Sequence, residues 1–111
     1  MQRILITAAI ALAPALVGAQ EIDAKKIFDS RCSLCHGVDG TGSGPAGASL
    51  KPPPTNFTTA DYWKSATPEH VKSVIISGKP GTAMVPFGAV LKPDEIEALA
   101  KYVRGFGPKE Q

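Results

Sequence analysis

Apolar residues recur at helical spacing in three separate segments of the chain. In the first, Asp23 precedes a face that includes Ile27 and Phe28. An aspartate in this position is a favoured N-cap, because its carboxylate accepts a hydrogen bond from a backbone N–H group of the first turn. The pattern therefore predicts a helix over about residues 22–32.

The second and third segments carry stronger signals for where a helix begins. Thr67-Pro68-Glu69 combines an N-cap residue, a proline at the first helical position and an acidic first turn. This helix is expected to end near Gly78. The third is expected to begin at Lys92-Pro93-Asp94-Glu95, although lysine is a poor N-cap, and to end near Gly105. Its apolar stripe consists of Ile96, Leu99, Ala100 and Val103.

A stretch rich in glycine and proline separates the first two helices. It contains five glycines within residues 37–47 and three consecutive prolines at positions 52–54. A long loop in a small domain is either disordered or functional. A short helical turn over residues 59–64 is expected to close this one. No segment shows the alternation of a strand, so the pattern predicts an all-α fold.

Residues 1–19 have the pattern of a secretory signal peptide. A single positive charge precedes an apolar run over residues 4–17, and small residues lead to an expected cut after Ala19. An uncleaved membrane anchor is the alternative, but the run is shorter than the roughly 20 residues that span a bilayer, and Pro14 interrupts it. We therefore expect export to the bacterial periplasm, no stable membrane insertion, and one domain over residues 20–111.

Composition narrows the classes of function. The chain has 12 basic and 10 acidic residues, which argues against a nucleic-acid binder, because such proteins carry a strongly basic face. It has only four Phe, two Tyr and one Trp. A domain of this size with so few aromatic residues is marginally stable by apolar burial alone, so a large apolar prosthetic group would complete its core.

The segment Cys32-Ser33-Leu34-Cys35-His36 carries the chemistry, and it contains both cysteines of the chain. The Cys-x-x-Cys-His spacing is a haem-attachment signal. Each thiol can add across a vinyl group of the porphyrin, and the adjacent imidazole can bind the iron as an axial ligand. The sequence therefore predicts one covalent haem c, held by Cys32 and Cys35 and ligated by His36.

The second axial ligand has three candidate solutions. After loss of the leader, Met84 is the one remaining methionine, and it lies between glycine and proline in a loop before the third predicted helix. His70 is the one other histidine, in the first turn of the second helix beside charged neighbours, where a solvent-exposed role is the simpler interpretation. The second axial position of the iron can also stay without a protein ligand. Met84 is the preferred ligand, and thioether ligation with histidine raises the reduction potential.

Two other classes of function compete with electron transfer. A haem with an open or labile sixth site would bind small ligands or show peroxidase-type activity. A thiol–disulfide oxidoreductase would use Cys32 and Cys35 directly, but such Cys-x-x-Cys motifs occur near a βαβ pattern that this chain lacks.

The order of these features resembles the class I c-type cytochromes, which are small soluble electron carriers with one haem. The resemblance extends over about residues 21–106. It is carried by Phe28, the Cys32–His36 motif, the glycine-proline loop, the segment Met84-Val85-Pro86-Phe87, and a C-terminal helix with Leu99 and Tyr102. It implies the cytochrome c fold, with three to four short helices and long loops around the haem, and contact of Phe28 with Leu99 or Tyr102.

Bacterial periplasmic members of that family are the most similar in their loops. In the family a proline carbonyl accepts a hydrogen bond from the ligand imidazole. Pro45 and the run over residues 52–54 both match, and Pro54 is the preferred acceptor for His36. Many members have proline directly after the ligand methionine, whereas Val85 intervenes here.

Two further residues are candidates for contact with the haem. The sole tryptophan, Trp63, can donate its indole N–H to a haem propionate or pack against the porphyrin edge. Arg31 can pair with a propionate or remain a surface charge.

The sequence thus predicts a periplasmic one-electron carrier that is not itself an enzyme. It would be a free shuttle or the cytochrome subunit of a redox enzyme complex, with unidentified redox proteins as partners.

Overall fold

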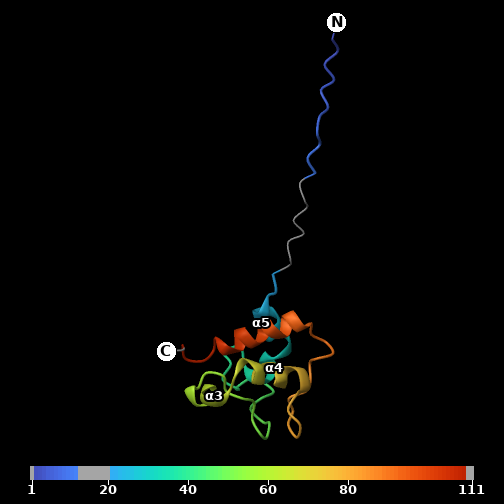
Figure 1. Cartoon of the computed structure of the whole chain (residues 1–111). Coiled ribbons are helices and arrows are strands. Elements are labelled where there is room, and N and C mark those ends of the chain that lie inside the picture. The colour runs from blue at the N-terminus through green and yellow to red at the C-terminus, as the bar shows by residue number, and fades with distance from the viewer. Residues whose placement is uncertain (1, 13–20, 110–111) are drawn as a thin grey trace.

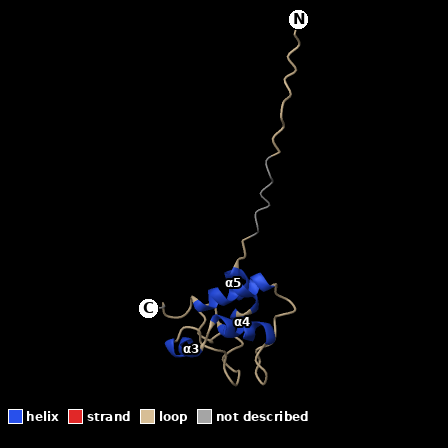
Figure 2. Cartoon of the chain, viewed as in Figure 1, coloured by secondary structure: helices blue, strands red, loops and turns tan. Residues whose placement is uncertain are grey.

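A computed structural model of the protein describes residues 2–12 and 21–109. Within these ranges all regular structure is helical, and no strand is present (Figures 1 and 2). The helices are α1 (Ala24–Arg31), α2 (Ser33–His36), α3 (Ala60–Ser65), α4 (Pro68–Ser77) and α5 (Pro93–Arg104). The predicted all-α class is confirmed, and the separate short helix α2 is a feature that the sequence pattern did not predict.

The helices begin where their N-cap residues predict. The Asp23 carboxylate accepts a hydrogen bond from the Lys26 backbone N–H at 3.0 Å, and the Thr67 hydroxyl accepts one from the backbone of His70 at 3.1 Å. The start of α5 is held differently. There the Glu95 carboxylate accepts from the Lys92 backbone N–H at 2.9 Å, which compensates for the poor N-cap residue.

The core lies where α5 packs against both α1 and α4. Phe28 of α1 is fully buried, and its ring centroid lies 5.3 Å from that of Tyr102 and 5.2 Å from that of Phe106. Leu99 of α5 belongs to the same buried cluster. The contact of Phe28 with the C-terminal helix, which the family resemblance implied, is confirmed.

We expect Phe28→Ala to lower the free energy of unfolding of the haem-loaded protein by about 3–5 kcal/mol, because truncating a fully buried aromatic ring removes its transfer energy and leaves a cavity. Leu34→Ala is the matched control, since that side chain is 62% exposed and should change stability little. Urea unfolding followed by circular dichroism measures both. A loss below about 1 kcal/mol for Phe28→Ala would contradict this account of the core.

The glycine-proline stretch is an ordered loop. The Gly42 backbone N–H donates to the His36 carbonyl at 2.7 Å, and the Phe57 N–H donates to the Gly40 carbonyl at 2.7 Å. A Cβ atom on Gly44 would collide with the Leu34 carbonyl oxygen, so this part of the loop rests directly on α2. The loop therefore wraps back over the end of α2 and fixes the segment after His36.

Residues 2–12 form no helix, and they are exposed. Residues 13–20, with the predicted cleavage position after Ala19, lie outside the described residues. Among the residues that the structure describes, no helix has the length and apolar character needed to cross a bilayer.

Candidate haem site

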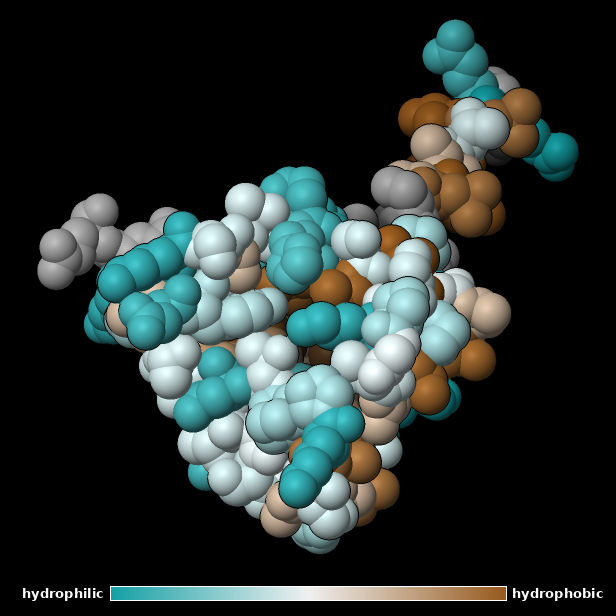
Figure 3. Space-filling model, turned by 90° about the horizontal axis from the view of Figure 1, so that it is seen from below, coloured by the Kyte–Doolittle hydropathy of each residue, from teal (hydrophilic) through white to brown (hydrophobic). Residues whose placement is uncertain are grey.

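A cavity of about 240 Å³ lies between residues of all five helices and two loops. Its volume far exceeds the roughly 30 Å³ that one water occupies. The loops are those over residues 50–57 and 79–87. Its wall is mainly apolar and consists of Phe28, Leu50, Pro52, Pro53, Pro54, Phe57, Tyr62, Val71, Val74, Ile75, Ala83, Val85, Phe87, Leu99 and Val103. Seen from below, the molecule shows patches of apolar surface between hydrophilic side chains (Figure 3).

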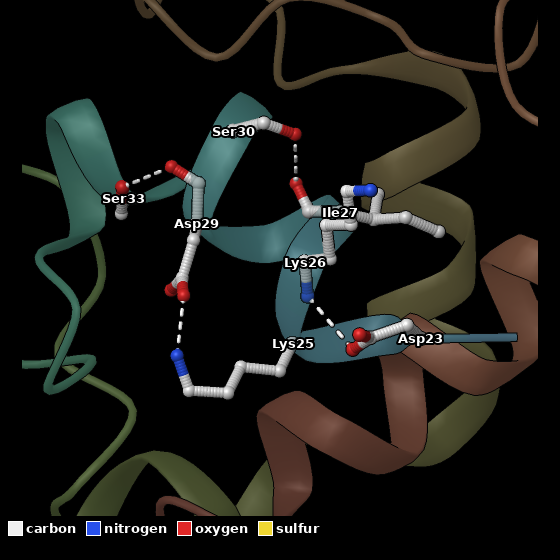
Figure 4. A network of polar contacts seen from close by, with 7 residues as sticks. All are labelled: Asp23, Lys25, Lys26, Ile27, Asp29, Ser30 and Ser33. Atoms are coloured by element: carbon white, nitrogen blue, oxygen red, sulfur yellow. Dashed lines mark hydrogen bonds and ion pairs between the residues drawn. The ribbon is translucent and has the colours of Figure 1, made fainter.

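The junction between α1 and α2 places both cysteines at this cavity. The Cys32 backbone N–H donates to the Phe28 carbonyl at 2.8 Å, and the Ser33 hydroxyl donates to the Asp29 carbonyl at 2.6 Å. Figure 4 shows that this second bond links the end of α1 to the start of α2, beside the Lys25–Asp29 ion pair. The two helices are thereby fixed to each other on either side of Cys32.

Both thiols are free and line the cavity. Burial raises the pKa of the Cys32 thiol to about 11, with the Arg31 guanidinium opposing the shift. The group is therefore a neutral thiol at pH 7. A neutral thiol is compatible with an apolar wall, because an unpaired thiolate there would be desolvated.

The His36 imidazole is fixed on one side and free on the other. Its Nδ1 atom lies 3.1 Å from the Thr55 carbonyl oxygen, which can only accept, so Nδ1 carries the proton. Its ring stacks on Phe57 with centroids 4.5 Å apart. Burial lowers the pKa of His36, and the hydrogen bond to Thr55 opposes this. The neutral ring therefore keeps the Nε2 lone pair for a metal.

The carbonyl that orients His36 belongs to Thr55, so the prediction of Pro54 was wrong by one residue. The Pro54 carbonyl faces the preceding loop instead, since a Cβ atom on Gly42 would lie 2.6 Å from it. The ring of Pro54 still lines the cavity. The other proline considered, Pro45, is exposed.

Met84 and His70 both line the cavity, but they are held differently. Met84 is half-buried and lies in the loop between α4 and α5. His70 is exposed in the first turn of α4, where its backbone N–H is used by the helix cap.

Trp63 does not line the cavity, and its indole proton has a partner in the protein. Nε1–H donates to the Phe57 carbonyl at 2.7 Å, whereas the sequence predicted that it donates to a haem propionate or that the ring packs against the porphyrin edge. The Arg104 guanidinium covers the indole ring at 4.8 Å from its centroid. Trp63 thus supports the backbone of the residue that stacks on His36. Neither Thr55 nor Phe57 was predicted as a site residue, although both closely follow the proline run over residues 52–54.

The charged residues that line the cavity are cationic. Arg31 reaches it from the end of α1 and Lys79 from the loop after α4, and no aspartate or glutamate among the described residues lines it. A group that brings two carboxylates to the cavity therefore meets positive charge there. Two thiols, an oriented neutral imidazole, a thioether, apolar walls and a cationic rim together fit a covalently bound haem.

Comparisons with known proteins point to the same chemistry. Residues 19–103 match the family described as cytochrome c oxidase, cbb3-type, subunit III. A curated relative, the cbb3-type cytochrome c oxidase subunit CcoP of Rubrivivax gelatinosus, is 30% identical over 79 residues, which are 71% of this chain and 23% of that protein. The chain therefore spans less than a quarter of the length of this relative.

Solved structures share the fold. The KustC0563 c-type cytochrome is 32% identical, with a TM-score of 0.66 over 78% of this chain and 100% of that one. A chain of the Kuenenia stuttgartiensis reducing HAO-like protein complex Kustc0457/Kustc0458 is 24% identical, with a TM-score of 0.67 over 76% of this chain and 41% of that one.

Proposed function

Because the chain belongs to the cbb3-type cytochrome c oxidase subunit III family of c-type cytochromes, we propose that it is a one-electron carrier of the periplasm. Cys32 and Cys35 would hold one haem c through thioethers, and His36 and Met84 would be its axial ligands. When bound, the haem supplies an iron centre that accepts and releases one electron.

One observation carries this proposal. Both thiols, the His36 ring and Met84 line the same cavity, and the one N–H group of that ring already donates to Thr55. The hydrogen bond fixes the tautomer and the orientation of the imidazole and increases its basicity toward a metal. Phe57 holds the ring from its face, so little in the protein has to move when the charge at the iron changes.

The protein's other residues exclude competing chemistry. The apolar side chains of α4 and α5 keep water away from the centre, and Met84 would fill the position that oxygen or peroxide needs. Arg31 and Lys79 supply positive charge at the cavity, where haem propionates would be paired.

The setting of the protein is also part of the proposal. Residues 1–19 would direct export as a cleaved signal peptide, leaving a domain over residues 20–111. The names of the matched proteins include an oxidase subunit and a multi-protein complex. We accordingly propose redox proteins as partners, with this chain as a free shuttle or as the cytochrome subunit of a complex.

A potentiometric titration of the haem-loaded protein, followed by its visible spectrum, tests this function. We expect a reversible titration with a slope of about 59 mV per tenfold change in the ratio of oxidised to reduced protein, as for one electron. The oxidised protein should consume no added peroxide. Irreversible reduction, or sustained turnover of peroxide, would contradict the role of an electron carrier and support the alternative of an open site.

A further inference from the structure

We propose that Thr82 is a positioning residue for Met84, and that its hydroxyl group holds the Met84 backbone so that the thioether stays at the cavity. This inference rests on the proposed role of Met84 as an axial ligand. Thr82 lies two positions before Met84 in the same loop. The Thr82 side chain also lines the cavity.

A tight turn brings the Thr82 side chain next to Met84. The Thr82 backbone N–H donates to the Lys79 carbonyl at 3.1 Å, which closes a four-residue turn. Pro80 and Gly81 occupy its central positions, and Gly81 has a φ of +78°. Proline followed by glycine at positive φ is the signature of a type II turn. The sequence therefore fixes the path of the chain up to Thr82.

The Thr82 hydroxyl links Lys79 to Met84. It accepts a hydrogen bond from the Met84 backbone N–H at 3.2 Å and donates one to the Lys79 carbonyl at 2.7 Å. The Lys79 N–H in turn donates to the Met84 carbonyl at 3.0 Å. Both backbone polar groups of Met84 are thus held, and the hydroxyl of Thr82 supplies the bond on the N–H side.

The rest of the loop is fixed independently of Thr82. The Phe87 backbone N–H donates to the Ile75 carbonyl at 2.8 Å, which joins the far end of the loop to α4. At the near end Gly78 has a φ of +68°, and a Cβ atom there would lie 2.7 Å from the Met84 carbonyl oxygen. Loss of the Thr82 hydroxyl therefore removes the bond on the N–H side of Met84 without detaching the loop from the helix.

The experiment compares carbon monoxide binding by haem-loaded, reduced Thr82→Val, Thr82→Ser and wild-type protein at neutral pH. Carbon monoxide can enter only when the Met84 sulfur has left the iron, so its association rate reports how often the loop releases it. We expect Thr82→Val to bind about three- to tenfold faster than wild type, the population change expected from losing one net hydrogen bond. Thr82→Ser keeps the hydroxyl and should bind at nearly the wild-type rate.

Thr41→Val is the matched control. Its hydroxyl donates to the Asp39 carboxylate at 2.8 Å in a different loop, so this change removes a comparable bond and should leave the carbon monoxide rate unaltered. The urea midpoint of each variant, measured alongside, separates local loosening from general destabilisation.

The contrary results test two separate claims. The role of the Thr82 hydroxyl would be overturned by a wild-type rate in Thr82→Val, by an equal rise in Thr41→Val, or by a rise of the same size in Thr82→Ser. These results would leave the assignment of Met84 as the ligand unchanged. Immediate binding by the wild type, together with a ferric spectrum that lacks the sulfur-to-iron absorption band, would contradict the ligand assignment itself.

Discussion

Met84→Ala is expected to lower the reduction potential of the haem-loaded protein by on the order of 0.1 V, within the range of about 0.8 V that axial ligands span. A neutral thioether favours reduced iron over oxidised iron, and its loss removes that preference. The same variant should lose the sulfur-to-iron absorption band of the ferric form and should bind carbon monoxide rapidly when reduced. A potentiometric titration measures the first effect and visible spectroscopy the other two.

Val90→Ala is the control for this prediction. Val90 lies in the same connection between α4 and α5, is 57% exposed and does not line the cavity, so the variant changes this connection without touching the sulfur or the cavity wall. It should keep the potential and the absorption band. An unchanged band in Met84→Ala would contradict the assignment of Met84. Loss of the band with carbon monoxide binding still slow would show that a group other than sulfur fills the position, and Met84→Ala combined with His70→Ala would then test the second histidine that lines the cavity.

The double variant Cys32→Ser/Cys35→Ser is expected to lose its haem under denaturing conditions that leave the wild-type haem attached. A serine hydroxyl is too weak a nucleophile to take the place of a thiol in adding to a vinyl group. The variant should also show reduced helical content, because the two cysteines border a cavity that the apolar core alone does not fill. Acid–ketone extraction and circular dichroism measure these effects.

Two further variants make this result specific. Cys35→Ser alone retains one thioether and should keep its haem on extraction. Leu34→Ala changes an exposed residue between the two cysteines and should behave as the wild type. Retention of haem by the double variant would contradict covalent attachment at these positions.

The helices could be predicted from the sequence because their signals are local. Thr67 and Asp23 cap helices through hydrogen bonds to residues three positions away. Because both partners of each bond are close in the sequence, such caps can be predicted from it. The ends at Gly78 and Gly105 have the same local origin. The poor N-cap at Lys92 is also compensated locally, because the Glu95 carboxylate three residues later accepts a hydrogen bond from the Lys92 backbone N–H.

The details of the site could not be predicted in the same way, because they depend on contacts between distant segments. Which carbonyl meets His36 is decided where Gly42 packs against Pro54, and this contact turns one carbonyl away and presents the next. The indole N–H of Trp63 donates to the Phe57 carbonyl rather than to the predicted haem propionate. The sequence identifies the His36 and Trp63 rings as hydrogen-bond donors, but it does not identify the carbonyl groups that accept from them.

The loop that contains Met84 combines local features, which the sequence predicts, with contacts that depend on the fold. Its turn is local and results from Pro80-Gly81, whose geometry the sequence specifies. The bonds from Thr82 to both Lys79 and Met84 depend on the closure of the whole loop. Met84 could be proposed as a candidate ligand from the sequence alone, whereas the bonds that hold its backbone required the structure.

The central claim is that both axial positions of the haem are filled by the protein, so that the chain transfers electrons without binding a substrate at the iron. Mixing the reduced, haem-loaded wild-type protein with carbon monoxide at neutral pH tests this claim most directly. The account predicts slow binding, limited by release of the Met84 sulfur. Rapid, stoichiometric formation of the carbon monoxide complex would contradict it and would assign the protein to the haem proteins with an open sixth site.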